Sequence, residues 1–104
     1  MKKPVKIQEL EVGKYYYTAE YTSKKSNKQR KSWWKVMTKD QEWVSFQVLN
    51  MLDNTPIDYH SYYHVWLQDV FYKDYQWQET TQEDFVNAIA EFKCHLNELL
   101  IHHS

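Results

Sequence analysis

The sequence predicts a small α+β domain in which an antiparallel sheet of three to four strands is packed by a C-terminal helix. Two patterns favour this class: apolar–polar alternation of period two between Lys14 and Met51, and a helical apolar stripe near the C-terminus. A chain of 104 residues can bury one hydrophobic core, so we expect residues 1–104 to form a single domain. The predicted strands cover approximately residues 14–22, 32–38, 42–51 and 62–68, and the predicted helix approximately residues 81–101.

The first predicted strand follows Gly13, the only glycine in the chain. A glycine at this point indicates a turn or bulge whose backbone conformation other residues resist. Tyr15, Tyr17 and Tyr21 then alternate with Tyr16, which divides the tyrosines between two faces of a strand.

The second and third predicted strands continue the same alternation on either side of a turn at residues 39–41. Matching the more apolar faces gives one expected core face: Tyr15, Tyr17, Tyr21, Trp34, Val36, Val44, Phe46 and Val48. The opposite face mixes aromatic and polar residues: Tyr16, Trp33, Lys35, Met37, Trp43, Gln47 and Leu49. Antiparallel sheets often leave one face in water, and the mixed face is too aromatic for an ordinary solvated surface yet too polar for a clean core.

Residues 52–79 are the ambiguous part of the chain. Asn54-Thr55-Pro56 indicates a linker or turn over residues 52–61. The stretch 62–77 fits both a helical stripe and strand alternation, and its aromatic and β-branched content favours a fourth strand near 62–68. Residues 72–79 are then expected to form an irregular connection.

The C-terminal helix is predicted from its start signal and its stripe. Thr80 with Glu83 three residues later matches a capping box. The stripe has spacings of 4, 3, 4 and 3 and runs through Phe85, Ile89, Phe92, Leu96 and Leu99. Which sheet face the helix covers stays open: on the Trp33 side it would make the tryptophans structural, and on the Val44 side it would leave them exposed.

Composition excludes several classes of function. A single glycine cannot build a phosphate-binding loop, a dinucleotide fingerprint or a nucleophile elbow. No apolar run approaches the ~20 residues of a membrane span, and the basic start lacks the apolar segment of a signal peptide. Cys94 is the only cysteine and has no internal disulfide partner, so we expect a cytoplasmic protein without a cofactor.

The titratable residues do not form a recognisable catalytic or metal motif. His60 and His64 have the spacing of two zinc ligands on a helix, but no Cys-x-x-Cys or His-Glu-x-x-His pattern supplies the rest. Cys94 and His95 are adjacent, and neighbouring helix positions point about 100° apart, so they form no nucleophile–base pair by themselves. We therefore expect no metal site, no catalytic residue and a non-enzymatic protein.

The strongest functional signal is charge combined with aromatic residues. Residues 1–36 carry a formal charge of +7 and residues 37–104 carry −8. Five cations cluster within eight residues at the expected hairpin tip, and three aromatics share a predicted face nearby. This predicts nucleic-acid binding through phosphate contacts and base stacking by Lys24, Lys25, Lys28, Arg30, Lys31, Trp33, Trp43 and Tyr16. An ordinary solvated hairpin tip remains the alternative for the cations.

The second hypothesis is a protein–protein interaction module or a small inhibitor. An acidic and aromatic surface can block a nucleic-acid-binding enzyme by occupying its basic cleft, and a phage or mobile-element origin is compatible with this role. The expected contact residues are Asp69, Asp74, Glu79, Glu83 and Asp84. The partner is thus nucleic acid or a nucleic-acid-handling protein, and a weak second apolar strip with Ala90, Cys94 and Ile101 leaves room for a homodimer.

Overall fold

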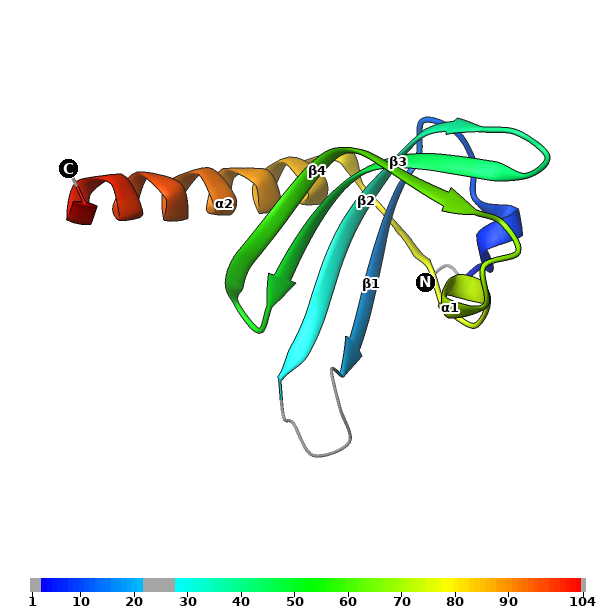
Figure 1. Ribbon diagram of the computed structural model, residues 1–104, viewed down its shortest axis with the longest axis horizontal. Coiled ribbons are helices and arrows are strands. Elements are labelled where there is room, and N and C mark those ends of the chain that lie inside the picture. The colour runs from blue at the N-terminus through cyan, green and yellow to red at the C-terminus, as the bar shows by residue number, and fades with distance from the viewer. Residues whose placement is uncertain (1–2, 22–27, 104) are drawn as a thin grey trace.

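A computed structural model describes residues 3–21 and 28–103 (Figure 1). Within this part of the chain the sheet has five antiparallel strands in the order β4-β3-β2-β1-β5. In chain order the elements are η1 (Ile7–Glu9), β1 (Tyr15–Tyr21), β2 (Gln29–Lys39), β3 (Trp43–Leu52), β4 (Thr55–Trp66), α1 (Val70–Lys73), β5 (Gln78–Thr80) and α2 (Gln82–His103). The α+β class is confirmed, whereas the predicted number of three to four strands was too low.

Both differences from the prediction lie between residues 52 and 80: β5 was not predicted, and β4 begins earlier than predicted. β4 begins at Thr55 rather than near Tyr62, directly after a tight turn in which Asp53 adopts φ +54°. Asp tolerates this left-handed conformation better than most residues, so the turn needs no glycine. Pro56 is accommodated because β4 is an edge strand and the register with β3 shifts between Asn50 and Met51. β5 has only three residues, too few to show alternation.

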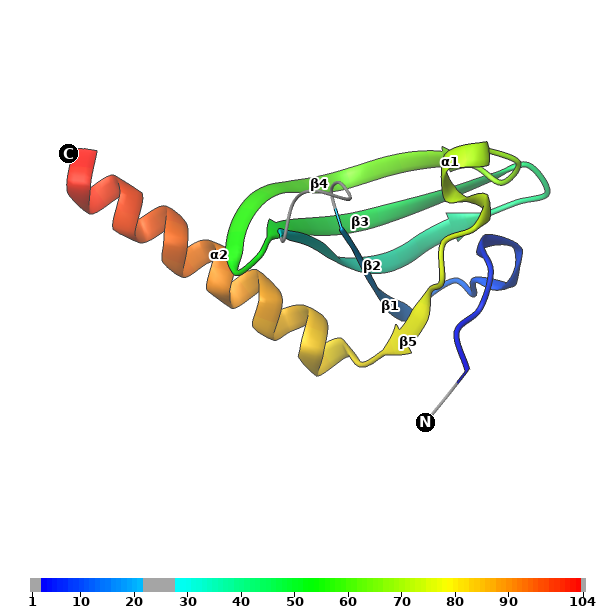
Figure 2. The same ribbon diagram turned by 90° about the horizontal axis from the view of Figure 1, so that it is seen from below.

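One face of the sheet, here called the α1 face, carries the main core. The sheet curls around η1, α1 and the segment before β5 (Figures 1 and 2). At its centre the Trp34 ring meets Phe46 and Trp77 at centroid distances of 4.8 and 4.7 Å, and Trp77 stacks on Phe46. The buried residues of this core are Ile7, Leu10, Tyr16, Trp34, Val36, Val44, Phe46, Val48, Val65, Leu67, Tyr72 and Trp77.

The predicted faces of β1 were wrong, and the register shows why. Tyr16 pairs with Trp34 and is only 2% exposed, so it belongs to the α1-face core. Its hydroxyl accepts a hydrogen bond from the Glu11 backbone N–H at 3.1 Å. Tyr15 and Tyr17 point to the opposite face, where the Tyr15 ring lies 5.3 Å from Phe85. Three consecutive tyrosines give no hydrophobicity contrast from which to choose a face.

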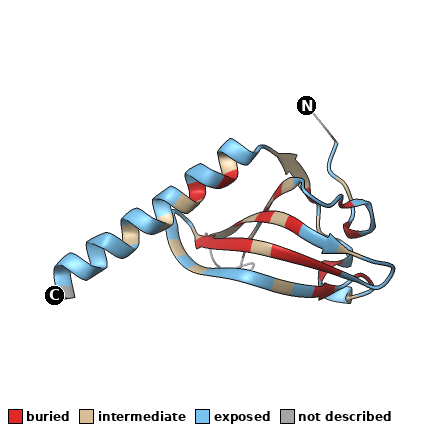
Figure 3. Cartoon of the chain, turned by 90° about the horizontal axis from the view of Figure 1, so that it is seen from above, coloured by how far each residue is buried: buried red, intermediate tan, exposed pale blue. Residues whose placement is uncertain are grey.

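The opposite face, here called the α2 face, is covered by α2 over part of its area. Leu49, Met51 and Ala88 form a small buried cluster with Trp33 and Phe92 packed against it. The helix therefore lies on the Trp33 side. Its cap is Thr81 rather than the predicted Thr80, because the Asp84 N–H donates to Thr81 Oγ1 at 3.1 Å. Figure 3 shows the buried positions of α2 near its N-terminal end and exposed positions along its C-terminal half.

Candidate functional site

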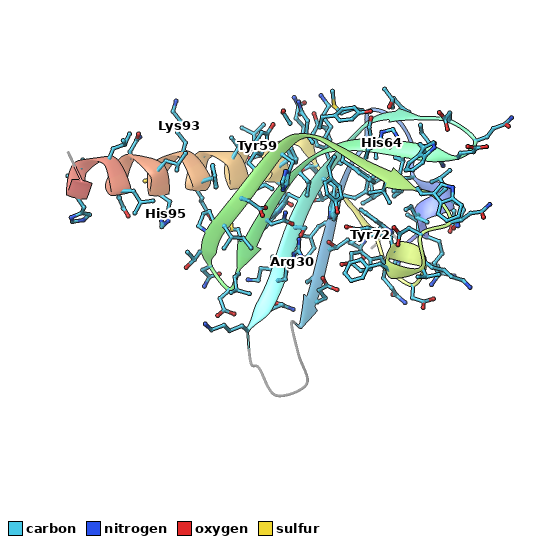
Figure 4. All side chains as sticks on the ribbon, in the orientation of Figure 1. Arg30, Tyr59, His64, Tyr72, Lys93 and His95 are labelled. Atoms are coloured by element: carbon cyan, nitrogen blue, oxygen red, sulfur yellow. The ribbon has the colours of Figure 1, made fainter. Side chains whose placement is uncertain are left out.

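The described cations of the predicted nucleic-acid site diverge. Lys24 and Lys25 lie outside the described residues. Lys28 is exposed before β2, whereas Arg30 and Lys31 are successive strand residues and so point to opposite faces (Figure 4 labels Arg30). Arg30 is opposite Glu20 on the α1 face, and Lys31 Nζ donates to Asn54 Oδ1 at 3.4 Å on the α2 face. The sheet does not gather these charges into one stripe.

The three aromatic residues of the predicted site are also separated. Tyr16 is buried and offers no ring face to a base. Trp33 is half-buried under α2, and its Nε1–H donates to Asp84 Oδ2 at 3.0 Å. Trp43 is 39% exposed, but it lies at the β2–β3 turn, beyond Lys39. From Lys31 to Lys39 β2 extends about 26 Å, so Trp43 and the tip cations do not form one compact site.

The five acidic residues of the second hypothesis come from three elements, and several hold the fold together. Asp69 caps α1 by accepting from the Phe71 N–H at 2.8 Å. Glu79 Oε1 lies 3.0 Å from Lys14 Nζ. Asp84 accepts from Trp33 and from Thr80 Oγ1, at 2.8 Å for the latter. Asp74 and Glu83 are exposed at the ends of two helices, so the set presents no continuous acidic face.

Members of both predicted sets meet in a polar groove of about 420 Å³ along one flank of α2. Its lining includes Lys31 and Trp33 from the first set and Glu79 and Asp84 from the second, with Glu91. The charged and polar groups here are largely bonded to one another or to neighbours, as Asp84 is to Trp33 and Thr80. These hydrogen bonds hold α2 against the sheet.

The other flank of α2 is apolar. A groove of about 320 Å³ lies between α2 and β4, lined by Leu49, Tyr59, Ile89, Phe92, Lys93 and Leu96. Figure 4 shows Lys93 and His95 leaving α2 on opposite sides, with Tyr59 on β4 beside the helix. The two flanks therefore differ in chemistry, and the apolar one faces the middle of β4.

Beyond this groove α2 extends past the edge of the sheet (Figures 1 and 2). We call residues 96–103 the α2 extension. Its large apolar side chains are substantially exposed: Leu96 44%, Leu99 43%, Leu100 66% and Ile101 73%. The sequence predicted the stripe of this helix correctly, but it did not predict that the stripe outruns the sheet it covers.

β4 is a long edge strand. Its twelve residues pair with β3 on one side, and the sheet order places no described strand on the other. The segment contains no Lys, Arg or Glu, and its single formal charge, Asp58, accepts from Asn50 Nδ2 at 2.6 Å. Edge strands are commonly protected from pairing with other chains by lysines, prolines or bulges. β4 has no lysine, and its Pro56 and its two register irregularities lie on either side of Tyr59. Sequence reasoning missed this surface because Pro56 indicated a linker.

The two histidines of the rejected zinc pattern do not converge. A register shift between Phe46 and Val48 places His60 opposite Val48 on the α1 face and His64 opposite Ser45 on the α2 face. The His64 and Trp43 rings are tilted by 41° with their centroids 4.5 Å apart, and His64 Nδ1 lies 2.7 Å from the Tyr62 hydroxyl. In the part of the chain that the structure describes, no group of three or more His, Cys, Asp or Glu residues could hold a metal ion.

Comparisons with protein-family models, with curated proteins and with solved structures found no match. Among the described residues, no helix combines the length and apolarity needed to cross a membrane.

Proposed function

We propose that the protein is a non-enzymatic protein-interaction module that binds an extended strand of its partner along β4, beneath the α2 extension. The observation that carries this proposal is the projection of α2 beyond the free edge of β4 (Figures 1 and 2). This proposal keeps the protein-interaction hypothesis but assigns the contact to the sheet edge instead of the acidic residues.

The α2 extension has the length to cover an added strand. Leu96 lines a groove with Tyr59 of β4, and the helix continues to His103. Eight residues of helix span about 12 Å, and neighbouring strands are about 4.8 Å apart, which leaves room for about two more strands.

The helix face above that space is apolar. Phe85, Phe92 and Leu99 are seven residues apart, close to two full turns, so Leu99 faces the same side as the sheet-packed phenylalanines. An added strand would satisfy the outward backbone groups of β4 and bury the exposed parts of Leu96 and Leu99. Edge addition of this kind draws affinity from main-chain hydrogen bonds and specificity from alternate side chains. We therefore expect the bound segment to alternate apolar and polar residues.

Selection from a displayed library of random 12-residue peptides tests the proposal. Wild-type protein should enrich peptides with period-two apolar patterns and no proline at their centre. Leu99→Glu should abolish the enrichment because it places a charge on the face that covers the strand. Val70→Glu is the matched control, since Val70 is 82% exposed on α1, which packs on the sheet face opposite α2. Equal enrichment by wild type and Leu99→Glu would refute the proposal.

Nucleic-acid binding by the cations around the β1–β2 connection is a second candidate. Lys28 is exposed and Arg30 and Lys31 follow it within three residues, so charge is the observation that favours it. Without a shared stacking surface, binding should be independent of sequence and strongly salt-dependent. Fluorescence anisotropy with labelled single- and double-stranded oligonucleotides at low salt tests this. Affinity that is absent, or that survives replacement of Lys24, Lys25, Lys28, Arg30 and Lys31 by Ala, would exclude it.

A further inference from the structure

We infer that the strand received by β4 is β4 of a second copy of this chain, in a two-fold symmetric dimer with one continuous sheet. This inference rests on the proposed function of the β4 edge and names its partner. Each α2 extension then covers part of the partner's sheet, so each covered site is completed by the other subunit.

The charge distribution of β4 permits it to pair with itself. Thr55–Trp66 carries one formal charge, at Asp58, and the strand is otherwise aromatic, aliphatic or neutral polar apart from its histidines. An antiparallel pair centred at Tyr59 places Asp58 opposite His60 of the partner subunit, because symmetry matches positions equally far from the centre. Within one chain His60 Nε2 already lies 3.7 Å from Asp58 Oδ1, so these side chains share the α1 face of the edge.

The position of α2 fixes where the symmetry axis must lie. Asn54 lines the groove on the polar flank of α2 and Tyr59 lines the groove on its apolar flank, so the helix crosses β4 between these residues. A two-fold axis perpendicular to the sheet brings both helices to the same face, running antiparallel side by side. Helices pack at 8–10 Å, which puts each helix about 4–5 Å from the axis, or about 1.5 strand residues. The axis therefore passes near Tyr59.

The flank of α2 that turns toward the axis has the chemistry of a helix–helix contact. The Tyr59 side carries Ile89, Leu96 and Leu100 with one cation, Lys93, whereas the opposite flank carries three carboxylates: Asp84, Glu91 and Glu98. Leu96, which lines the apolar groove of about 320 Å³ beside Tyr59, then lies nearest the axis and meets its counterpart there, while the exposed Leu100 packs on the partner helix one turn away from the axis. A two-fold axis on the acidic flank would instead oppose like charges.

The surface is large enough for a specific dimer. A pair centred at Tyr59 joins residues 55–63 of the two copies; these nine residues, the eight of the α2 extension and the groove residues Ile89, Phe92 and Lys93 amount to about 20 residues a side, at the lower bound of a standard protein interface. Edge pairing adds backbone hydrogen bonds within residues 55–63, and closed two-fold dimers are the commonest assemblies of soluble proteins.

Sedimentation equilibrium over a range of concentrations gives the first test. Wild type should sediment at twice the chain mass of 12.8 kDa. Leu96→Glu should weaken the dimer at least ~10-fold, because two glutamates would meet in a desolvated contact beside the axis. Leu96 is 44% exposed, so the variant should fold, and Val70→Glu should leave the dimer unchanged.

Cross-linking tests the register. In a Cys94→Ser background, Tyr59→Cys places two cysteines next to the axis, where opposed Cα atoms are about 4.5–5.5 Å apart, within disulfide range. Tyr62→Cys is the control: Tyr62 is 64% exposed on the same strand, yet the two symmetry-related positions would be about 20 Å apart. Mild oxidation should cross-link the first variant and not the second.

Two results would overturn the inference. A monomer at all concentrations excludes the dimer but leaves peptide selection by the β4 edge as an independent test of the proposed function. A dimer that survives Leu96→Glu, without cross-linking at Tyr59, uses another surface. Conversely, cross-linking in the predicted register together with no enrichment of peptides would support the inference. It would also mean that the β4 edge binds only a second copy of the chain.

Discussion

The hydrogen bond from Trp33 Nε1–H to Asp84 Oδ2 should hold α2 in place on the sheet, and a double-mutant cycle measures its contribution. The two atoms are 3.0 Å apart and both residues are half-buried. A hydrogen bond to a charged acceptor contributes about 1.5–3 kcal/mol net. Trp33→Phe removes the donor and Asp84→Ala removes the acceptor. We expect a coupling free energy of about 1–2 kcal/mol, because partial exposure reduces the full value.

Urea unfolding followed by far-UV circular dichroism is the assay. With an m-value of about 1–3 kcal/mol/M, each single variant should lower the midpoint by about 0.5–1.5 M, and the double variant by less than the sum. Glu83→Ala is the control for the helix N-terminus, since Glu83 is an exposed carboxylate in the same first turn. A coupling near zero would refute the reasoning, because it would mean that this hydrogen bond does not stabilise the docking of α2 on the sheet.

Three further predictions concern the fold. Trp77→Ala should cost about 3–5 kcal/mol of unfolding free energy, and Trp77→Phe distinctly less, because the buried Nε1–H has no hydrogen-bond partner among the described residues; equal losses in urea melts would contradict this. Gly13→Ala should cost about 1 kcal/mol from its φ of +86° alone, because no described atom lies within 4 Å of the added Cβ; an unchanged urea midpoint would contradict it. Burial, and in second place the hydrogen bond with Tyr63, raises the pKa of Tyr72; the unfolded chain therefore loses its proton first, so stability is complete below pH ~10 and falls above it. Urea midpoints between about pH 8 and 11 should fall less steeply for Tyr72→Phe, and an identical slope would count against this cause.

The sequence predicted the elements whose patterns are local and long enough to read. The alternation through Trp34, Val36, Phe46 and Val48 placed all four on the correct face, because β2 and β3 contrast apolar with polar positions. The helix stripe was equally clear. β1 failed for the opposite reason, since tyrosine occupies both faces and only pairing with Trp34 decides which side is the core.

The candidate site was harder to predict from the sequence, because it depends on where β4 and α2 end relative to one another in the folded chain. Pro56 breaks a central strand but is allowed at an edge, and edge position is a property of the assembled sheet. Likewise, Leu96 and Leu99 continue the stripe of Phe85 and Phe92 with no change in pattern, yet the sheet beneath them ends at β4. A hydrophobic stripe predicts that something apolar will cover it, and not which chain supplies the cover.

The partial cover of the α2 face links these observations. The α1 face is closed by η1, α1 and the Trp77 segment, all from the same chain. On the α2 face a single straight helix packs on the five-stranded sheet. Because it runs across the strands, it covers only a short segment of each strand. Past β4 the helix extends over solvent. Its leucine side chains there stay exposed in a monomer, which is unfavourable. The proposed partner strand beside β4 would bury these leucines and pair with the β4 edge, and the same segment of α2 would then account for both features.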